Sequence, residues 1–263
     1  MSTEPVVLVN RHIVTDPAES GSPTAHIAIV TMNRPEARNA LNADLSAALP
    51  EAIRTCNAEP GVRAIVLTGA DPAFCAGFDL RDIGGGKKKG TNTHPGYWGA
   101  LPPTAVPVIG AINGAAITGG FEIALACDFL IASDRAVFAD THAKVGMVPG
   151  WGLTIALPRL IGTGRARRMS LTAEKIDAVT ARDWGLVTEI VPHDELLTRA
   201  ITLATLISTN HAKAVEEIRR VYDAVAPLGD SDEAYAYENA AARAWAQRRF
   251  GQQSSPEKGL GEA

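Results

Sequence analysis

The sequence of 263 residues predicts an α/β core domain followed by a C-terminal helical lobe. Short runs rich in β-branched residues alternate with helical patterns up to about residue 190, as expected for consecutive β units that stack on one another. From about residue 192 onward the periodicity is helical and shows no strand pattern. We therefore expect a core domain over residues 1–195 and a helical lobe with a polar tail over residues 196–263.

Four β-branched runs predict buried strands, at residues 26–33, 63–69, 106–113 and 128–133. Between the first two runs, Asn42 precedes apolar residues at helical spacing from Leu45 to Cys56, which predicts a capped amphipathic helix. Pro50 lies inside this pattern and should kink the helix or end it early. The Gly- and Lys-rich stretch 83–96 predicts a mobile loop, and the composition after Phe250 is typical of disorder.

The composition excludes several classes of protein. With 46% hydrophobic and 21% charged residues the chain is typical of a soluble globular protein, and a net charge of −4 argues against nucleic-acid binding. No apolar run approaches eighteen residues, so neither a signal peptide nor a membrane span is expected. Cys56, Cys75 and Cys127 form no C-x-x-C pair, which argues against a zinc site or disulfide framework and favours a reducing cytoplasm.

Two adjacent glycines, Gly119 and Gly120, follow an apolar strand and begin a helix. The first N–H groups of a helix have no intrahelical partner, and glycines leave them open to an anion or to a carbonyl oxygen that becomes one. The alternative is that the glycines only let the strand and the helix pack closely. A second stretch, residues 71–80, also follows a strand and contains a turn at Ala76 and Gly77, where N–H groups should again be free. Two such donors on one oxygen would form an oxyanion hole.

At these residues the sequence resembles the crotonase, or enoyl-CoA hydratase/isomerase, superfamily. The matching motifs run in order along most of the chain: "NRPEARNAL" (33–41), "AFCAGFDL", "INGAAITGGFEIALACD", "VGMVPGWG" (145–152) and "ARDWGLVTEIVP" (181–192). The resemblance implies a crotonase-like spiral of stacked ββα units with a C-terminal helical domain. It also implies an acyl-CoA substrate and assembly as a homotrimer or a dimer of trimers.

The resemblance assigns roles to residues of both glycine-containing stretches. It implies that the backbone N–H groups of Ala76 and Gly119 are the oxyanion donors. It places the first motif along the nucleotide of coenzyme A and the "AGFDL" segment along the pantetheine. The residues expected near coenzyme A are Ala37, Arg38, Ala40, Gly77, Phe78, Asp79 and Leu80.

Hydratases of this family hold a water between two glutamates, and the first of these corresponds to Glu122. Apolar Phe121 and Ile123 beside it predict a raised pKa, whereas the alternative is a solvated helix glutamate. The second position holds His142 in place of a glutamate. Histidine exchanges protons near neutrality but cannot copy a carboxylate.

Three interpretations of His142 are open. It is a working acid/base partner, it redirects the site toward another reaction of the family, or it lines the pocket of a weak or inactive protein. Asp140 and Thr141 are close enough to orient the imidazole, and along an extended segment Asp140 shares the face of His142. Trp151 either reshapes the acyl pocket or packs in the core. Cys75 is expected to be a small buried hydrophobe and not a nucleophile.

The sequence thus favours a cytoplasmic enoyl-CoA hydratase-like enzyme of fatty acid metabolism. Glu122 would activate water, His142 would assist proton delivery, and Ala76 and Gly119 would hold the thioester oxygen. No metal or redox cofactor is expected, since coenzyme A enters as part of the substrate. The alternatives are a double-bond isomerase or a C–C hydrolase on the same scaffold, or a catalytically weak acyl-CoA binding protein.

Overall fold

The computed structural model of the protein describes residues 4–14, 25–79, 81 and 99–250. The chain divides into two compact units, Met1–Ala212 and Lys213–Ala263. The predicted loop 83–96 and the tail after Phe250 lie essentially outside the described residues. Among those residues, no helix is both long and apolar enough to cross a membrane.

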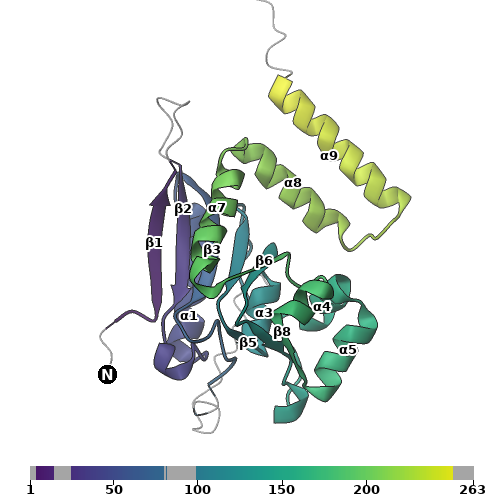
Figure 1. The fold of residues 1–263 in the computed structure, drawn as a ribbon. Helices are drawn as coiled ribbons and strands as arrows, with labels where there is room; N and C mark the ends of the chain where they lie inside the picture. Colours follow the sequence, from purple (N-terminus) through teal and green to yellow (C-terminus); the bar gives the residue numbers. More distant parts are fainter. Residues whose placement is uncertain (1–3, 15–24, 80, 82–98, 251–263) are drawn as a thin grey trace, which may run out of the picture. The chain divides into compact units, whose positions relative to one another are not determined.

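A six-stranded sheet forms the centre of the first unit (Figure 1). Its strands are parallel except for the first, which pairs antiparallel with the second at one edge. In spatial order they are β1 (Val7–Ile13), β2 (His26–Met32), β3 (Val62–Gly69), β4 (Val108–Ile112), β6 (Phe129–Ser133) and β9 (Glu189–Val191). A smaller sheet contains β5 (Ala115–Ile117), β7 (Val137–Ala139) and β8 (Lys175–Asp177). The four predicted strands are confirmed as β2, β3, β4 and β6.

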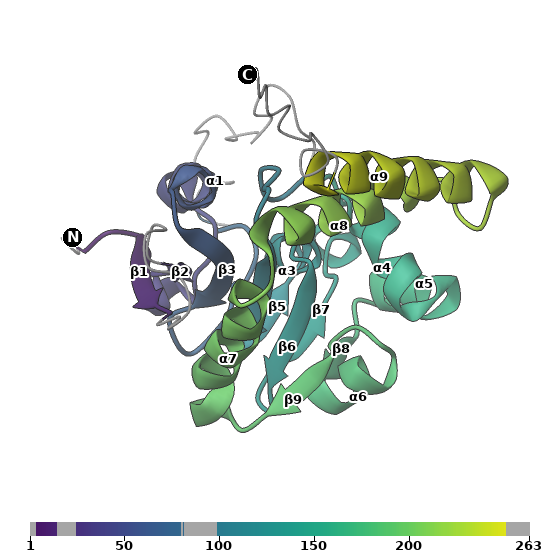
Figure 2. The same ribbon diagram turned by 90° about the horizontal axis from the view of Figure 1, so that it is seen from above.

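Helices cover both faces of the large sheet (Figure 2). The cluster on one face includes residues of α1 and α3, and the cluster on the other includes Leu196, Ala200 and Ala204 of α7. The helices of the first unit are α1 (Ala43–Ala58), α3 (Gly119–Leu125), α4 (Leu153–Ile161), α5 (Thr163–Thr172), α6 (Ala178–Asp183) and α7 (Leu196–Ser208). The expected domain boundary at 195/196 lies just before α7, and the two compact units divide after α7 because this helix is buried against the sheet.

Helix α1 has the predicted cap, because the Asn42 side chain accepts a hydrogen bond from the N–H of Leu45 at 2.9 Å. The helix continues through buried Pro50 to Ala58, so the expected early end does not occur. The second unit contains α8 (Ala212–Val225) and α9 (Asp232–Phe250). Glu217 of α8 forms ion pairs with Arg220 of its own helix and with Arg248 of α9. Both helices lie within the predicted C-terminal lobe.

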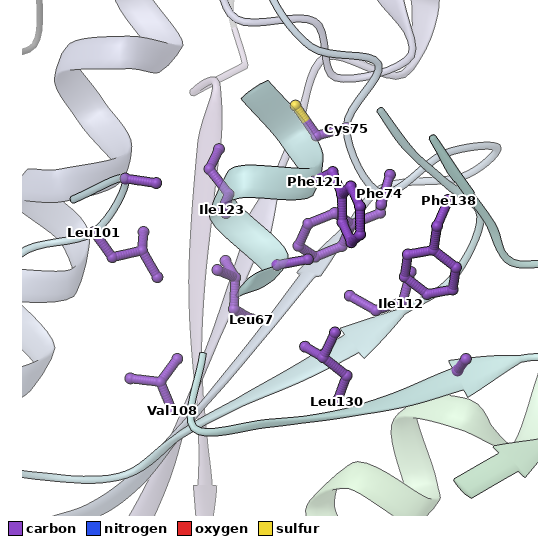
Figure 3. Packing of buried hydrophobic residues seen from close by; sticks show 14 of the residues in the cluster. Leu67, Phe74, Cys75, Leu101, Val108, Ile112, Phe121, Ile123, Leu130 and Phe138 are labelled. Carbon is purple, nitrogen blue, oxygen red and sulfur yellow. The ribbon is translucent and has the colours of Figure 1, made fainter. Parts of the chain in front are cut away.

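Buried aromatic rings pack between α3 and the strands of the first unit (Figure 3). The ring centroids of Phe121 on α3 and Phe138 on β7 are 5.7 Å apart, and Phe74 lies in the same cluster. This packing fixes the start of α3 against the segment that contains Cys75. The first turn of α3 is therefore held on a rigid support.

Candidate active site

Strand β5 turns into helix α3 at Thr118, whose φ of 55° is uncommon for a β-branched residue. Its N–H donates to the carbonyl of Ala139 at 2.9 Å, and its hydroxyl accepts from the N–H of Thr141 at 3.1 Å. The segment after β7 thus holds the strained corner in place. It also brings residues 139–142 beside the N-terminus of α3.

The two glycines at this corner serve different purposes. A Cβ on Gly120 would lie 2.1 Å from the carbonyl oxygen of Cys75, so this glycine permits close backbone packing. A Cβ on Gly119 would instead lie 3.2 Å from an edge atom of the Phe78 ring. The N–H of Gly119 has no hydrogen-bond partner among the described residues. Gly120 therefore fits the packing interpretation, and the N–H of Gly119 is open, as the other interpretation requires.

The Ala76 amide is already engaged. Its N–H donates to the carbonyl of Arg38 at 3.0 Å, and Arg38 has a φ of 52°. The segment is fixed on its other side by the N–H of Cys75, which donates to the carbonyl of Ala115 at 2.9 Å. The expectation that the Ala76 N–H is free is wrong in this structure, because the turn of the first motif supplies it with an acceptor.

Phe78 carries the amide that stays open. On either side of it, Gly77 accepts from the N–H of Leu41 at 2.8 Å and Asp79 donates to the carbonyl of Leu41 at 3.1 Å. The Phe78 N–H has no partner in the part of the chain that the structure describes. Gly77 has a φ of 89°, and a Cβ there would lie 2.9 Å from the Ile117 carbonyl oxygen and 3.7 Å from the Gly119 nitrogen. The open amides of Phe78 and Gly119 thus belong to adjacent segments.

Glu122 is buried one turn inside α3, with 2% of its surface exposed. Its Oε1 atom accepts from the N–H of Trp151 at 2.8 Å and from the N–H of Gly150 at 3.2 Å. Burial raises the pKa of Glu122, although these backbone hydrogen bonds and nearby His142 oppose the shift. The prediction of a raised pKa is confirmed, and the alternative of a solvated glutamate is wrong.

His142 lies beside Glu122, with its Nε2 atom 3.7 Å from Glu122 Oε2. On the other side of the ring, Nδ1 lies 2.7 Å from Asp140 Oδ1, and the same oxygen accepts the backbone N–H of His142 at 3.1 Å. Asp140 and His142 thus face each other as expected, while Thr141 contacts Thr118 instead. The cause is a turn closed by the Asp140 side chain before the short helix Ala143–Val145, and not an extended strand.

Asp140 remains a carboxylate although only 1% of it is exposed. Burial acts to raise its pKa, but hydrogen bonds from His142 and from Ser170 on α5 outweigh burial and hold the pKa below its usual value. The buried group is therefore a line of three side chains, Glu122, His142 and Asp140. Sequence reasoning weighed Asp140 only as a neighbour of the ring, and its contact with Ser170 across 30 residues has no local signal.

Trp151 lies at this site and also packs against the main core cluster. The centroids of its ring and the Phe78 ring are 5.0 Å apart, with the planes inclined by 52°. The Trp151 backbone thus contacts Glu122, while its ring contacts the ring of Phe78. The contact with the core cluster supports the interpretation of Trp151 as a packing residue, and its role in an acyl pocket stays a prediction.

The residues of the first motif that are expected near coenzyme A lie on and after the turn that follows β2. Ala37 is half-buried, Arg38 exposed and Ala40 buried. Sequence reasoning missed Asn39 between them, whose buried side chain donates to the carbonyls of Ala70 and Ala73 at 2.7 Å each.

Asp79 has an internal partner. Its carboxylate pairs with Arg34 and Arg81 at 3.3 Å each, so it braces the turn. Leu80 lies outside the described residues. Among those residues, no group of three or more His, Cys, Asp or Glu side chains is arranged to hold a metal ion.

Cys75 is buried, and burial raises the pKa of its thiol to about 12. We therefore expect iodoacetamide to leave the activity of the native protein unchanged. A disulfide reagent should react slowly with the native chain and with all three cysteines after denaturation. Rapid inactivation by modification of Cys75 alone would contradict the structural role assigned to this residue.

The profile of the Enoyl-CoA hydratase/isomerase family matches residues 23–260. The chain belongs to this family. The resemblance seen in the sequence motifs is thereby confirmed.

The chain is similar to the probable enoyl-CoA hydratase 1, peroxisomal, of Arabidopsis thaliana. It is 38% identical over 216 residues, which cover 81% of this chain and 79% of that protein. The mitochondrial enoyl-CoA hydratase of Pongo abelii is 35% identical over 212 residues, covering 78% of this chain and 73% of that protein.

Solved structures of the family confirm the crotonase-like fold. The crystal structure of enoyl-CoA hydratase from Mycobacterium smegmatis matches with a TM-score of 0.74 and 41% identity, covering 93% of this chain and all of that one. The crystal structure of enoyl-CoA hydratase EchA1 from Mycobacterium marinum matches with a TM-score of 0.80 and 31% identity, covering 95% of this chain and 93% of that one.

Proposed function

We propose that this family member adds water across the double bond of a 2-enoyl-CoA thioester. The observation that carries the proposal is the buried pair of Glu122 and His142, 3.7 Å apart, near two open amides. Hydration needs one group to take a proton from water and another to deliver a proton to the α-carbon. The relatives named enoyl-CoA hydratases support the same reaction.

The backbone N–H groups of Phe78 and Gly119 hold the thioester oxygen in this proposal. The amide of Phe78 replaces that of Ala76, because the latter donates to Arg38. Hydrogen-bond donors fixed in advance stabilise the negative charge that develops on this oxygen as the enolate forms, and each donor contributes about 10²–10³ in rate. The fixed corner at Thr118 keeps the Gly119 donor in place.

The acid and the base are distinguished by their contacts. Two amides donate to Glu122 Oε1, and in this proposal Oε2, the oxygen that lies toward His142 Nε2, accepts a proton from water. The distance of 3.7 Å from Oε2 to His142 Nε2 exceeds a hydrogen bond, and in this proposal one water lies at about 2.8 Å from both atoms. Glu122 takes a proton from this water, and His142 delivers a different proton, the one on its Nε2 atom, to the α-carbon.

The loss of absorbance of a conjugated enoyl thioester tests the proposal directly. We expect purified enzyme to consume crotonyl-CoA and to yield the 3-hydroxyacyl-CoA. Shift of a 3-enoyl double bond without hydration would favour an isomerase, and cleavage of a β-diketone thioester would favour a C–C hydrolase. Tight binding of acyl-CoA without turnover would favour a binding protein.

We propose that no metal or redox cofactor takes part, because the two amides and the Glu122–His142 pair supply the charge stabilisation and the proton transfers. Overnight dialysis against EDTA should then leave kcat and KM unchanged. Loss of activity that added Mg²⁺ or Zn²⁺ restores would contradict this part of the proposal.

We propose further that the enzyme works in the cytoplasm as a homotrimer or a dimer of trimers. Exposed apolar side chains on or beside α4 and α5, among them Val148, Ile155 and Leu171, support burial against another copy. The cysteine pattern supports a reducing compartment, although the named relatives include peroxisomal and mitochondrial proteins. Light scattering after gel filtration tests the assembly, and fractionation of cells tests the location.

A further inference from the structure

Asp140 is the charged group closest to His142, and its geometry is more specific than that of a general ion pair. One oxygen, Oδ1, receives both the backbone N–H of His142 and the Nδ1 side of the ring, at 3.1 and 2.7 Å. The Asp140 side chain also accepts a hydrogen bond from Ser170 on α5. Three contacts from two elements thus fix the carboxylate, which is 1% exposed.

This arrangement determines which ring nitrogen carries the permanent proton. An ionised carboxylate only accepts hydrogen bonds, so Nδ1 must be the donor. Nε2 is then the nitrogen that gains and loses a proton, and it faces Glu122 from α3. Among the described residues, Glu122 and Asp140 are the charged groups in contact with His142.

The ionised Asp140 also changes the net charge that accompanies proton transfer from His142. An isolated histidine acid carries +1 before proton transfer and 0 after it. With ionised Asp140 attached, the pair carries 0 before transfer and −1 after it. Those are the charges of a carboxylic acid, the group that the family resemblance leads one to expect at position 142. A neutral acid also avoids an uncompensated cation in a site where His142 is 3% exposed.

We propose that Asp140 and His142 act as a single proton donor that replaces one carboxylic acid. His142 Nε2 gives its proton to the substrate α-carbon, and Asp140 is a positioning residue that fixes the ring tautomer and compensates its charge. Ser170 orients Asp140. The predicted change in kcat rests on the proposed hydration, whereas the predicted tautomer of His142 does not.

Kinetics provide the first test. In Asp140→Asn, kcat for crotonyl-CoA should fall by about 10²–10⁴-fold, while KM changes by no more than about threefold. Asp134→Asn makes the same chemical change at an exposed aspartate and should leave both constants unchanged. Adding His142→Glu to the Asp140→Asn protein should raise its kcat by at least about tenfold, because a single carboxylic acid at position 142 then donates the proton in place of the pair.

Nitrogen-15 NMR of histidine-labelled protein provides the second test and needs no substrate. The signals of His142, identified among the six histidines by their loss in His142→Gln, should show a protonated Nδ1 and a proton-free Nε2 whenever the ring is neutral. Asp140→Asn should change this tautomer or mix it with the other.

Wild-type kcat in Asp140→Asn, or an equal mixture of tautomers in the unmodified protein, would overturn the inference. If Asp140→Asn fails to fold, the spectrum of the unmodified protein decides. If the unmodified protein does not hydrate crotonyl-CoA, the proposed function fails, and the spectrum still decides whether Asp140 holds the ring.

Discussion

Glu122→Gln lowers kcat for enoyl-CoA hydration by about 10³-fold, within the range expected for loss of a general base. The glutamine keeps a carbonyl oxygen at the position of Oε1, where the N–H groups of Gly150 and Trp151 donate. It cannot take a proton from water at the other position. The effect should therefore appear in kcat, with little change in KM, when the decay of enoyl absorbance is followed.

Glu51→Gln is the matched control, because Glu51 lies on α1 with 69% of its side chain exposed. This variant should retain the kinetic constants of the unmodified enzyme. A Glu122→Gln protein that keeps a tenth or more of the original kcat would remove Glu122 from its proposed role.

The same substitution also has a predicted effect on stability. Because burial raises the pKa of Glu122, the folded state disfavours its charged form relative to the unfolded state. The free energy of unfolding is unaffected when the pH is below the ordinary pKa of a glutamate. It falls as the pH rises from there through the raised pKa of the folded state. At neutral pH and above, thermal unfolding of Glu122→Gln should therefore occur at or above the temperature of the unmodified protein. A lower melting temperature would show that the glutamine has lost the backbone contacts.

Gly120→Ala should destabilise the fold by about 3 kcal/mol or more, at the upper end of the cost of overpacking a core. The added methyl group would lie 2.1 Å from the Cys75 carbonyl oxygen and 2.7 Å from its Cβ. Neither atom can move away easily, because the Cys75 backbone is hydrogen-bonded on both sides to β5. Urea unfolding followed by circular dichroism measures the change in midpoint.

Gly164→Ala serves as the comparison for this experiment. Gly164 lies in α5, and a Cβ there would meet no atom within 4 Å. Its replacement should stabilise the helix by roughly 0.5–1 kcal/mol, since alanine is the better helix former. Equal urea midpoints for the two alanine variants would contradict the close packing described for Gly120.

The sequence predicted much of the fold because its strongest patterns are local. Runs of β-branched residues located β2, β3, β4 and β6, and Asn42 located the start of α1. The edge strand β1 was missed because its residues are mostly exposed and mix charged with apolar types. Pro50 did not end its helix, since burial against the sheet outweighs the local cost of proline.

The site was predictable as a set of residues but not as a set of contacts. The positions of Glu122 and His142 follow from the family motifs, whereas the 3.7 Å between their side chains is known only from the structure. The engagement of Ala76 by Arg38 depends on a left-handed turn about forty residues away, which no pattern near Ala76 reports. The same holds for the hydrogen bond from Ser170 to Asp140.

In Phe78 and Trp151 the backbone amide and the aromatic ring have different contacts, and this has a consequence for evolution and for engineering. The Trp151 N–H donates to Glu122 and the Phe78 N–H is open among the described residues, while the two attached rings pack against each other with centroids 5.0 Å apart. On the proposed function, we expect exchange of either ring to change which acyl groups the site accepts and to leave the two backbone amides in position. Libraries at these two positions are thus a direct route to variants with new selectivity on an unchanged catalytic framework.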